Sequence, residues 1–441
     1  MTKLIVGGGK KLKGDTEVSG SKNVALKALV AACLTTEEVI IENVPLISDF
    51  YVMCDIIKEL GGQVKILDHK VSVKLPEFKK TKISLERGAE IRTSAMFLAP
   101  LLARSRQAVI PNPGGCRLGA RPIDRTIEGL SKMGADIKYR SADGYFHARS
   151  RGLRGIEFTF SKNTHTGTET LIIAAVLAEG KTVLKNAAEE PEIDELISLL
   201  NSMGAKIKRT KKRTIEIVGV SKLHGTSFRI LPDRNEIVTI AIAAIVTGGD
   251  VFIKDVKKEG LEDFLSALEK AGGGYEIKNS GIRFFAKDGI SPTNIETSPY
   301  PGFMTDWQAP WAVLMTQAKG SSIIHETVFE NKLEYVRDLQ KMGANATLFN
   351  PKVSDKNKVY NFNLEDDSAD YFHAVKIEGP TSLHNAVVTM HNIRAGAAIV
   401  LASLIAKGES AILEIEHLDR GYEKFDERLK KLGADIKRVR K

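Results

Sequence analysis

The chain has 441 residues, 43% of them hydrophobic and 27% charged, and a formal net charge of +9. This length suits two or three domains, and the composition excludes a disordered or collagen-like chain. No apolar run approaches the roughly 20 residues that span a bilayer, and three cysteines make no disulfide framework. Residues 4–6 are too short an apolar stretch for a signal peptide. We therefore expect a cytoplasmic protein that does not insert into membranes.

The positive net charge favours anionic partners. However, the lysines and arginines are spread along the chain, and no basic block is interleaved with the aromatic residues that a nucleic-acid platform needs. Most of these side chains are expected to be ordinary solvated charges. We expect no nucleic-acid partner. Small phosphorylated molecules remain the other class of anionic ligand that the net charge favours.

One short glycine-containing pattern recurs six times along the chain. Successive first glycines are separated by 73, 70, 68, 71 and 90 residues. Each copy follows an amphipathic helical run and precedes an alternating strand, so the glycine is expected to end the helix. The copies are "ELGGQVKI" (59–66), "KMGADIKY" (132–139), "SMGAKIKR" (202–209), "KAGGGYEI" (270–277), "KMGANATL" (341–348) and "KLGADIKR" (431–438).

Each repeat also contains an Ala- and Leu-rich run, such as "NVALKALVAACL" near the start and "RAGAAIVLASLIA" near the end. These runs are apolar nearly all round, which predicts buried helices. The pattern indicates six α/β units of about 70 residues, most simply two domains of three. A solenoid is the alternative, but its usual period of roughly 20–50 residues is shorter. The polar segment 349–375 lengthens the last step and is expected to be a surface loop.

Several collinear motifs resemble the enolpyruvyl transferases, and among them the enzymes that act on UDP-N-acetylglucosamine. The resemblance covers nearly the whole chain. The matching stretches are "GSKNVAL" (20–26), "RTSAMFLAPLLAR" (92–104), "PGGC…RP.D" (113–124), "NAAEEPEIDELISLLNSMGAKI" (186–207), "LPDRNE" (231–236), "TDWQA" (305–309), "ETVFENK" (326–332) and "HLDRGYEKFDERLKKLGADI" (417–436).

The resemblance implies two inside-out α/β barrels, with helices inside and sheets facing solvent. It implies one domain over residues 22–230 and a second, discontinuous domain over 1–21 and 231–441. The implied reaction transfers the enolpyruvyl group of phosphoenolpyruvate to the 3-hydroxyl of UDP-N-acetylglucosamine and releases phosphate, at the start of peptidoglycan precursor synthesis. No metal, no organic cofactor and no oligomer is implied.

Cys116 is the candidate general acid, and in the family this cysteine also forms an adduct with phosphoenolpyruvate. Its glycine-rich loop contains Arg117 and Arg121 and precedes a helix expected to begin near Pro122. Cations and helix N-terminal amides lower a thiol's pKa. A small buried hydrophobe is the usual alternative for a lone cysteine, and Cys33 and Cys54, in apolar helical runs, are assigned to that alternative.

The other proposed catalytic and binding residues come from the same resemblance. Asp306 is the candidate general base, although an aspartate before a helix often serves as an N-cap. Cationic side chains suit a ligand that carries both a carboxylate and a phosphate, because arginine binds each in bidentate fashion. The residues implied around phosphoenolpyruvate are Lys22, Asn23, Arg121, Arg394 and Arg420. Those implied around the nucleotide sugar are Arg92, Arg121, Pro122, Ile123, Asp124, Arg125, Lys162, Thr166, Asp306 and Val328.

Four features depart from the family pattern. Asn392 replaces an aspartate, Lys332 replaces an arginine, "HTGTET" (165–170) replaces "VGATEN", and the segment 349–375 is unusual. Asn392 and Lys332 are kept among the expected substrate-binding residues. Two alternatives therefore stay open: a related transferase with another acceptor, and a weakly catalytic protein that binds a UDP-sugar for regulation. Asn392 is expected either to have removed a catalytic charge or simply to cap the following helix.

Overall fold

The computed structural model describes residues 2–114 and 123–440 and divides them into two compact units. Unit 1 joins the N-terminal residues up to Ser19 to the chain from Pro232 onward, and unit 2 lies between Gly20 and Leu231. The division thus falls at 19/20 and 231/232, within two residues of the crossings expected from the family resemblance.

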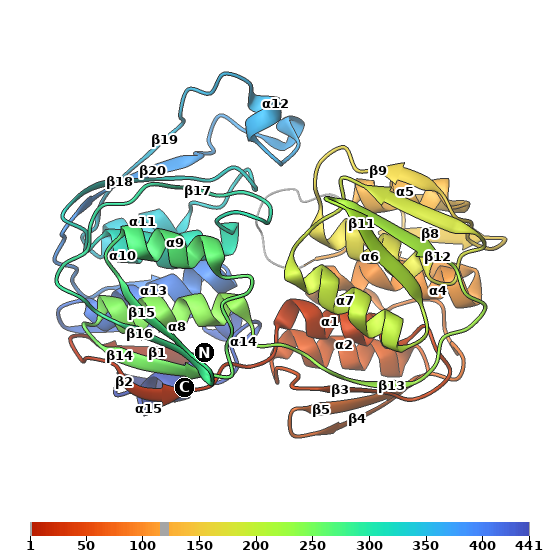
Figure 1. Ribbon diagram of the computed structural model, residues 1–441, viewed down its shortest axis with the longest axis horizontal. Helices are drawn as coiled ribbons and strands as arrows, with labels where there is room; N and C mark the ends of the chain where they lie inside the picture. Colours follow the sequence, from red (N-terminus) through yellow and green to blue (C-terminus); the bar gives the residue numbers. More distant parts are fainter. Residues whose placement is uncertain (1, 115–122, 441) are drawn as a thin grey trace. The chain divides into compact units, whose positions relative to one another are not determined.

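Unit 2 contains three repeats of central helix, strand, outer helix and hairpin (Figure 1). The first comprises α1 (Lys22–Ala32), β3 (Val39–Glu42), α2 (Ser48–Glu59), β4 (Gln63–Leu67) and β5 (Lys70–Lys74). The second comprises α3 (Leu85–Glu90), η1 (Arg92–Phe97), α4 (Leu98–Ser105), β6 (Gln107–Pro111), α5 (Asp124–Lys132), β7 (Ala135–Arg140) and β8 (Tyr145–Ser150). The third comprises β9 (Glu157–Thr159), α6 (His165–Ala175), β10 (Lys181–Lys185), α7 (Pro191–Ser202), β11 (Lys206–Lys211), β12 (Thr214–Val218) and β13 (Thr226–Arg229).

Unit 1 repeats the same order three times. Its first repeat comprises β2 (Lys13–Thr16), α8 (Arg234–Val246), β14 (Asp250–Lys254), α9 (Glu262–Lys270), β15 (Gly274–Lys278) and β16 (Gly281–Phe285). The next comprises β17 (Ile295–Glu296), η2 (Thr305–Trp307), α10 (Gln308–Met315), β18 (Gly320–His325), α11 (Tyr335–Lys341), β19 (Asn345–Phe349), α12 (Lys356–Val359), η3 (Leu364–Asp366) and β20 (Ala374–Gly379). The last comprises β21 (Val387–Thr389), α13 (Ile393–Ile405), β22 (Glu409–Leu413), α14 (Glu416–Asp419), α15 (Phe425–Lys431), β23 (Asp435–Arg440) and β1 (Thr2–Gly7).

The strands of each repeat form a separate small sheet. Among the described residues there are six sheets, five of four strands and one of three. In four of the five four-stranded sheets an antiparallel hairpin pairs with another strand of the repeat, and a parallel strand is added at the edge, as β13 is added to β3. In the last repeat β1 lies between β22 and β23, antiparallel to both, so the N-terminal strand completes the C-terminal repeat.

The repeated glycines end helices as expected. Gly61, Gly134, Gly204, Gly272, Gly343 and Gly433 all have positive φ, between 80° and 105°. Each directly follows the C-cap residue of an outer helix, where a left-handed residue turns the chain into the next strand. The six-fold sequence pattern is therefore a repeated turn as well as a repeated helix.

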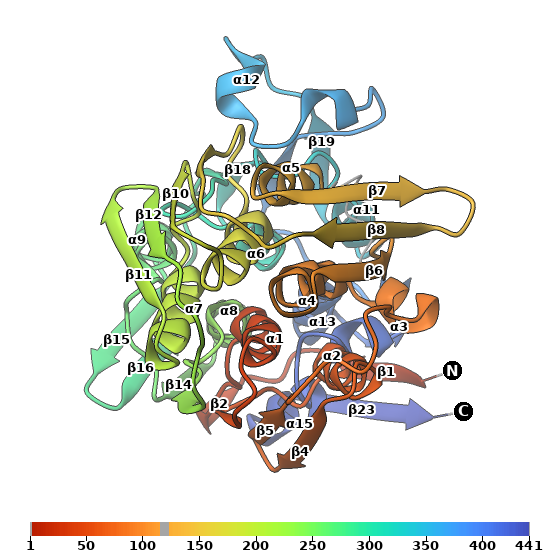
Figure 2. The ribbon, with the colours of Figure 1, turned by 90° about the vertical axis from the view of Figure 1, so that its right-hand side faces the viewer.

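The Ala- and Leu-rich helices form the core of each unit, which confirms the inside-out arrangement. All but the last residue of α8 are buried, and α8, α10 and α13 contact one another. In unit 2 the helices α1, α4 and α6 lie within the surrounding sheets (Figure 2). A charged pair is buried among these helices, with Lys27 Nζ of α1 3.3 Å from Glu169 Oε2 of α6. Burial raises the pKa of Glu169 to about 8, although the charge of Lys27 acts to lower it.

The segment 349–375 differs in part from the expected surface loop. Phe349 and Ala374–Val375 belong to the flanking strands, and the intervening residues include a short helix and buried aromatic side chains such as Tyr360 and Phe362. In the described chain, no helix combines the length and the apolar character needed to cross a membrane.

Candidate functional site

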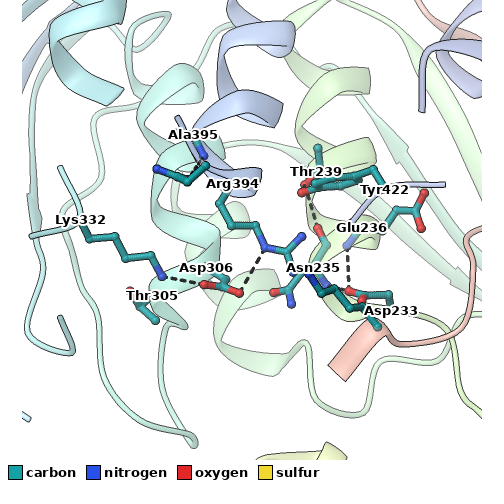
Figure 3. Close-up of polar contacts among 12 residues, drawn as sticks. Asp233, Asn235, Glu236, Thr239, Thr305, Asp306, Lys332, Arg394, Ala395 and Tyr422 are labelled. Atoms are coloured by element: carbon teal, nitrogen blue, oxygen red, sulfur yellow. Dashed lines mark hydrogen bonds and ion pairs between the residues drawn. The ribbon is translucent and has the colours of Figure 1, made fainter. Parts of the chain in front are cut away.

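Unit 1 brings Asp306, Lys332 and Arg394 together (Figure 3). Asp306 lies in η2, immediately before α10, and Arg394 is the second residue of α13. Lys332 Nζ lies 2.6 Å from Asp306 Oδ1, and Arg394 Nε lies 3.2 Å from Oδ2. Helix α10 contacts α13 in the core, so helix packing determines how these side chains meet.

The charge on Asp306 is stabilised by its two cations. Burial acts to raise the pKa of this carboxyl, but the charges of Lys332 and Arg394 and their hydrogen bonds outweigh it and hold the pKa far below its usual range. Lys332 is only 6% exposed, and its ammonium also lies 4.7 Å from the centroid of the Phe329 ring. With both cations in contact, Asp306 is therefore an ionised hydrogen-bond acceptor but a weak base.

Glu326 is a functional candidate that the sequence motifs did not single out. Its fully buried carboxylate accepts four hydrogen bonds. The donors are Thr305 Oγ1 at 2.7 Å, Gln308 Nε2 at 2.9 Å, Val328 N at 2.8 Å and Phe329 N at 2.9 Å. One carboxylate thus holds Thr305 and Gln308, on either side of Asp306, and the turn that leads to Lys332. The only signal in the sequence was its place in the "ETVFENK" stretch.

Asn392 caps α13. It is the N-cap residue, and its Oδ1 accepts a hydrogen bond from Ala395 N at 2.9 Å. Of the two expectations for this residue, the capping role is the one that the hydrogen bond supports. Two residues along, Arg394 is buried, and its Nη1 has no hydrogen-bond partner among the described residues. An unpaired buried N–H of a guanidinium is a ready donor to an anion.

The two remaining site candidates of unit 1 are Val328 and Arg420. Val328 is half-buried, and its backbone N–H is held by Glu326. Arg420 is a half-buried residue that directly follows α14, a short helix packed on α13.

In unit 2, Lys22 is the first residue of α1 and is buried. Its Nζ lies 2.6 Å from Oδ2 of Asp49, a buried residue in the first turn of α2. Asn23 follows Lys22 and is half-buried. Asp49 is the second residue that the sequence motifs missed. Its carboxylate keeps the Lys22 ammonium at the N-terminal end of α1.

The other described candidates of unit 2 share one position in the fold, namely at or just before the N-terminal end of a helix. Unsatisfied amide N–H groups at that end attract anions such as phosphate. The helix η1 contacts α1 and α6, and α5 packs against α6, so these ends belong to neighbouring helices. The residues are Arg92 in η1, Ile123, Asp124 and Arg125 at α5, Lys162 before α6, and Thr166 in its first turn.

Three expected site residues, Cys116, Arg121 and Pro122, lie outside the described residues. Within the described ranges, no cluster of three or more His, Cys, Asp or Glu side chains is placed to hold a metal ion. The described candidates of unit 1 are therefore cations around an ionised carboxylate, and those of unit 2 are a buried lysine and residues at helix N-termini.

The family model for EPSP synthase (3-phosphoshikimate 1-carboxyvinyltransferase) matches residues 6–429. The chain belongs to the enolpyruvyl (1-carboxyvinyl) transferase family. Curated relatives described as UDP-N-acetylglucosamine 1-carboxyvinyltransferase align with the whole chain. The protein from Koribacter versatilis is 38% identical over 100% of this chain and 97% of its own length. The one from Magnetococcus marinus is 40% identical over 100% of both.

Solved structures of the family share the fold. The enolpyruvyl transferase NikO from Streptomyces tendae has a TM-score of 0.86 at 21% identity and covers 99% of each chain. EPSP synthase from Acinetobacter baumannii has a TM-score of 0.72 at 17% identity and covers 100% of each chain. The expected two-domain α/β architecture is therefore confirmed.

The Lys332–Asp306 pair predicts a pH-dependent stability effect. Lys332→Met should lower the thermal midpoint at pH 7 by roughly 4–8 °C, the shift for about 2 kcal/mol lost when a half-buried carboxylate loses the charged hydrogen bond from one of its two cations. Because the folded-state pKa of Asp306 is lowered, this contribution is present above the ordinary pKa of about 3.9 and is lost as pH falls below it.

The gap between wild type and Lys332→Met, measured by calorimetry, should therefore narrow from about pH 5 downward. Lys332→Arg is the matched control and should keep most of the wild-type midpoint. A gap that does not change with pH would mean that Lys332 stabilises the fold by packing on Phe329 rather than by charge.

The cap at α13 predicts how Asn392 variants behave. Asn392→Asp should keep kcat for enolpyruvyl transfer within about twofold, because both residue types cap helices about equally and caps act on stability rather than on the barrier. Asn392→Ala should lower the thermal midpoint by roughly 2–4 °C, the shift for about 1 kcal/mol. A higher kcat for Asn392→Asp, with no lower KM for phosphoenolpyruvate, would instead show that the family's carboxylate stabilises the transition state.

Proposed function

We propose that this chain transfers the enolpyruvyl group of phosphoenolpyruvate to the 3-hydroxyl of UDP-N-acetylglucosamine and releases phosphate, as the first committed step of peptidoglycan precursor synthesis. The observation that carries the proposal is the ionised Asp306 held between Lys332 and Arg394, on a chain whose full-length relatives bear the name of this activity. The site needs no metal or organic cofactor in this mechanism, which we propose to run in the cytoplasm.

Arg394 is proposed to bind phosphoenolpyruvate. Its Nη1 has no partner among the described residues, so a carboxylate or phosphate oxygen gains a charge-assisted hydrogen bond there. Lys22, Asn23, Arg121 and Arg420 are proposed to supply the remaining contacts to this small dianion. Several fixed cations stabilise the charge that develops on the phosphate-bearing intermediate.

Asp306 is proposed to orient the sugar 3-hydroxyl and accept its proton. With two cations attached its basicity is low, so proton transfer depends on a change in those contacts. When an anionic substrate draws Arg394 toward itself, the attraction on Asp306 weakens and the pKa of the carboxyl rises toward its ordinary value. Binding of phosphoenolpyruvate thus prepares the base for the acceptor.

The nucleotide sugar is proposed to bind along the helix N-termini of unit 2 and against Val328. The proposed contacts are Arg92, Arg121, Pro122, Ile123, Asp124, Arg125, Lys162 and Thr166. Amide N–H groups at helix starts and nearby cations are suited to a diphosphate. The changed "HTGTET" stretch forms the start of α6, with Thr164 Oγ1 accepting from Gly167 N at 3.2 Å, so the helix begins with a regular cap despite the substitution.

The two substitutions in the unit 1 site do not favour the weakly catalytic alternative. Lys332 makes the contact with Asp306 that a longer arginine could also make, and Asn392 caps α13. Both side chains therefore have a role in the described geometry that is compatible with turnover.

Phosphate release decides between the acceptors. We expect the purified chain to release phosphate from phosphoenolpyruvate with UDP-N-acetylglucosamine and not with shikimate 3-phosphate. Asp306→Asn should lower kcat by about 10²-fold or more, because positioned bases contribute roughly 10²–10⁴-fold. Release with shikimate 3-phosphate alone would identify another acceptor, and release with neither would support the regulatory alternative.

Cys116 is proposed as the general acid, and its reactivity tests that role. The other two cysteines are fully buried, and burial raises the pKa of Cys33 and of Cys54 to about 12. Alkylation at neutral pH should therefore occur at Cys116, with a midpoint below the free-thiol pKa of about 8.5. A phosphonate epoxide that mimics phosphoenolpyruvate should label Cys116 and neither other cysteine, as read by peptide mass mapping. Labelling with a midpoint at or above that value would argue against an activated acid.

A further inference from the structure

The segment between β19 and β20 replaces a tight turn. In three other repeats the equivalent hairpin strands are joined by the residues 68–69, 212–213 and 279–280 alone. In this repeat residues 350–373 intervene and carry α12 and η3, which Figure 1 shows extending beyond the ends of β19 and β20. We call residues 350–373 the insertion.

The insertion has a small core of its own. The rings of Tyr360, Phe362 and His373 are buried, with centroids 4.9–5.2 Å apart. Asn361 N donates to Thr327 O at 2.8 Å, and Glu326 N donates to His373 O at 2.7 Å. The insertion is therefore ordered against the backbone of the segment that leads into Val328.

Within the insertion lies a cavity of about 280 Å³. Its size is near the lower end of small-ligand pockets. The lining residues are Asn350, Pro351, Lys356, Tyr360, Leu364, Asp367, Ser368, Ala369 and His373.

His373 is a buried polar side chain of this lining. It is 3% exposed, and its Nε2 lies 3.1 Å from Asp367 Oδ1. In the tautomer whose Nε2 donates to the carboxylate, Nδ1 is an acceptor. Nδ1 is buried and has no hydrogen-bond partner among the described residues. A buried polar atom without a partner requires an explanation, and a donor from a bound molecule provides one.

The charges of the lining select the kind of molecule. Lys356 supplies an ammonium and Asp367 a carboxylate, while Pro351, Tyr360 and Leu364 supply apolar surface. A multiply charged anion is disfavoured by Asp367 and by the neighbouring Glu365, Asp366 and Asp370. A simple cation would leave Lys356 facing like charge. A molecule with one ammonium, one carboxylate and a small apolar group complements all of these features.

We propose that the insertion is a second ligand site that binds a free α-amino acid with a small apolar side chain. The ligand carboxylate pairs with Lys356, its ammonium donates to Asp367 and to His373 Nδ1, and its side chain lies against Leu364 and Tyr360. Because the insertion is hydrogen-bonded to Glu326 and Thr327, occupancy also alters the Val328 turn; this second part rests on the proposed function.

Calorimetric titration of the full chain with L-alanine, L-valine and L-leucine tests the site without any assay of activity. We expect at least one of them to bind, and its N-acetyl and methyl ester derivatives, which each lack one charge, to bind at least about tenfold more weakly. No binding of any of the three, or equal binding of the blocked derivatives, overturns the proposal.

Variants of α12 locate the site. Lys356→Met should weaken binding at least about tenfold, because it removes a charge-assisted hydrogen bond. Lys358→Met, on the same helix but 85% exposed and outside the cavity lining, is the matched control and should bind as wild type. Equal affinity of the two variants would place any binding elsewhere and contradict the proposed site.

The effect of amino-acid binding on the nucleotide-sugar site is measured separately. In the phosphate-release assay, a saturating amino acid should change KM for UDP-N-acetylglucosamine in the wild type and in Lys358→Met, and not in Lys356→Met at the same concentration. Binding with an unchanged KM would disprove the coupling to Val328. Binding by a chain that releases no phosphate would retain the site and reject the proposed function.

Discussion

The ionisation of Asp306 is the constraint on which the site of unit 1 depends. A carboxylate beside a buried lysine and a buried arginine is stable only while its cations stay close. Asp306 and its two cations come from η2, α13 and the segment after β18, which lie far apart in the sequence. The buried Glu326 maintains the geometry around Asp306. Its four hydrogen bonds join Thr305 and Gln308 to the backbone of Val328 and Phe329.

Inside-out packing explains why so many expected ligand contacts lie at helix starts. The central helices are mostly apolar and are packed within each unit, so their sides are not available to a ligand. Their N-terminal ends still present unsatisfied N–H groups and carry residues such as Lys22, Thr166 and Arg394. A fold that buries its helices therefore places its polar functional groups at their ends, where a phosphate-bearing ligand is favoured.

The insertion shows how a repeat can gain an additional segment with its own cavity while its sheet keeps the same strand pairing. Strands β19 and β20 keep the antiparallel register of the other hairpins, from Asn345 with Glu378 to Phe349 with Ala374. The added residues bury their own aromatic rings and attach to the site through two backbone hydrogen bonds. The same residues line the cavity of the insertion.

The sequence by itself determined the six repeats, the buried helices and the turns, because these depend on local periodicity and on glycine at positive φ. Motif resemblance identified Asp306, Lys332 and Arg394, but not that they form one ion-paired group, since no spacing along the chain encodes that contact. It also left Asn392 undecided between two roles until the bond to Ala395 N was seen. Glu326, Asp49 and the cavity of the insertion came only from the tertiary structure. Their significance lies in which backbone amides and charges surround them once distant segments pack together, and a carboxylate or histidine alone carries no sign of that environment.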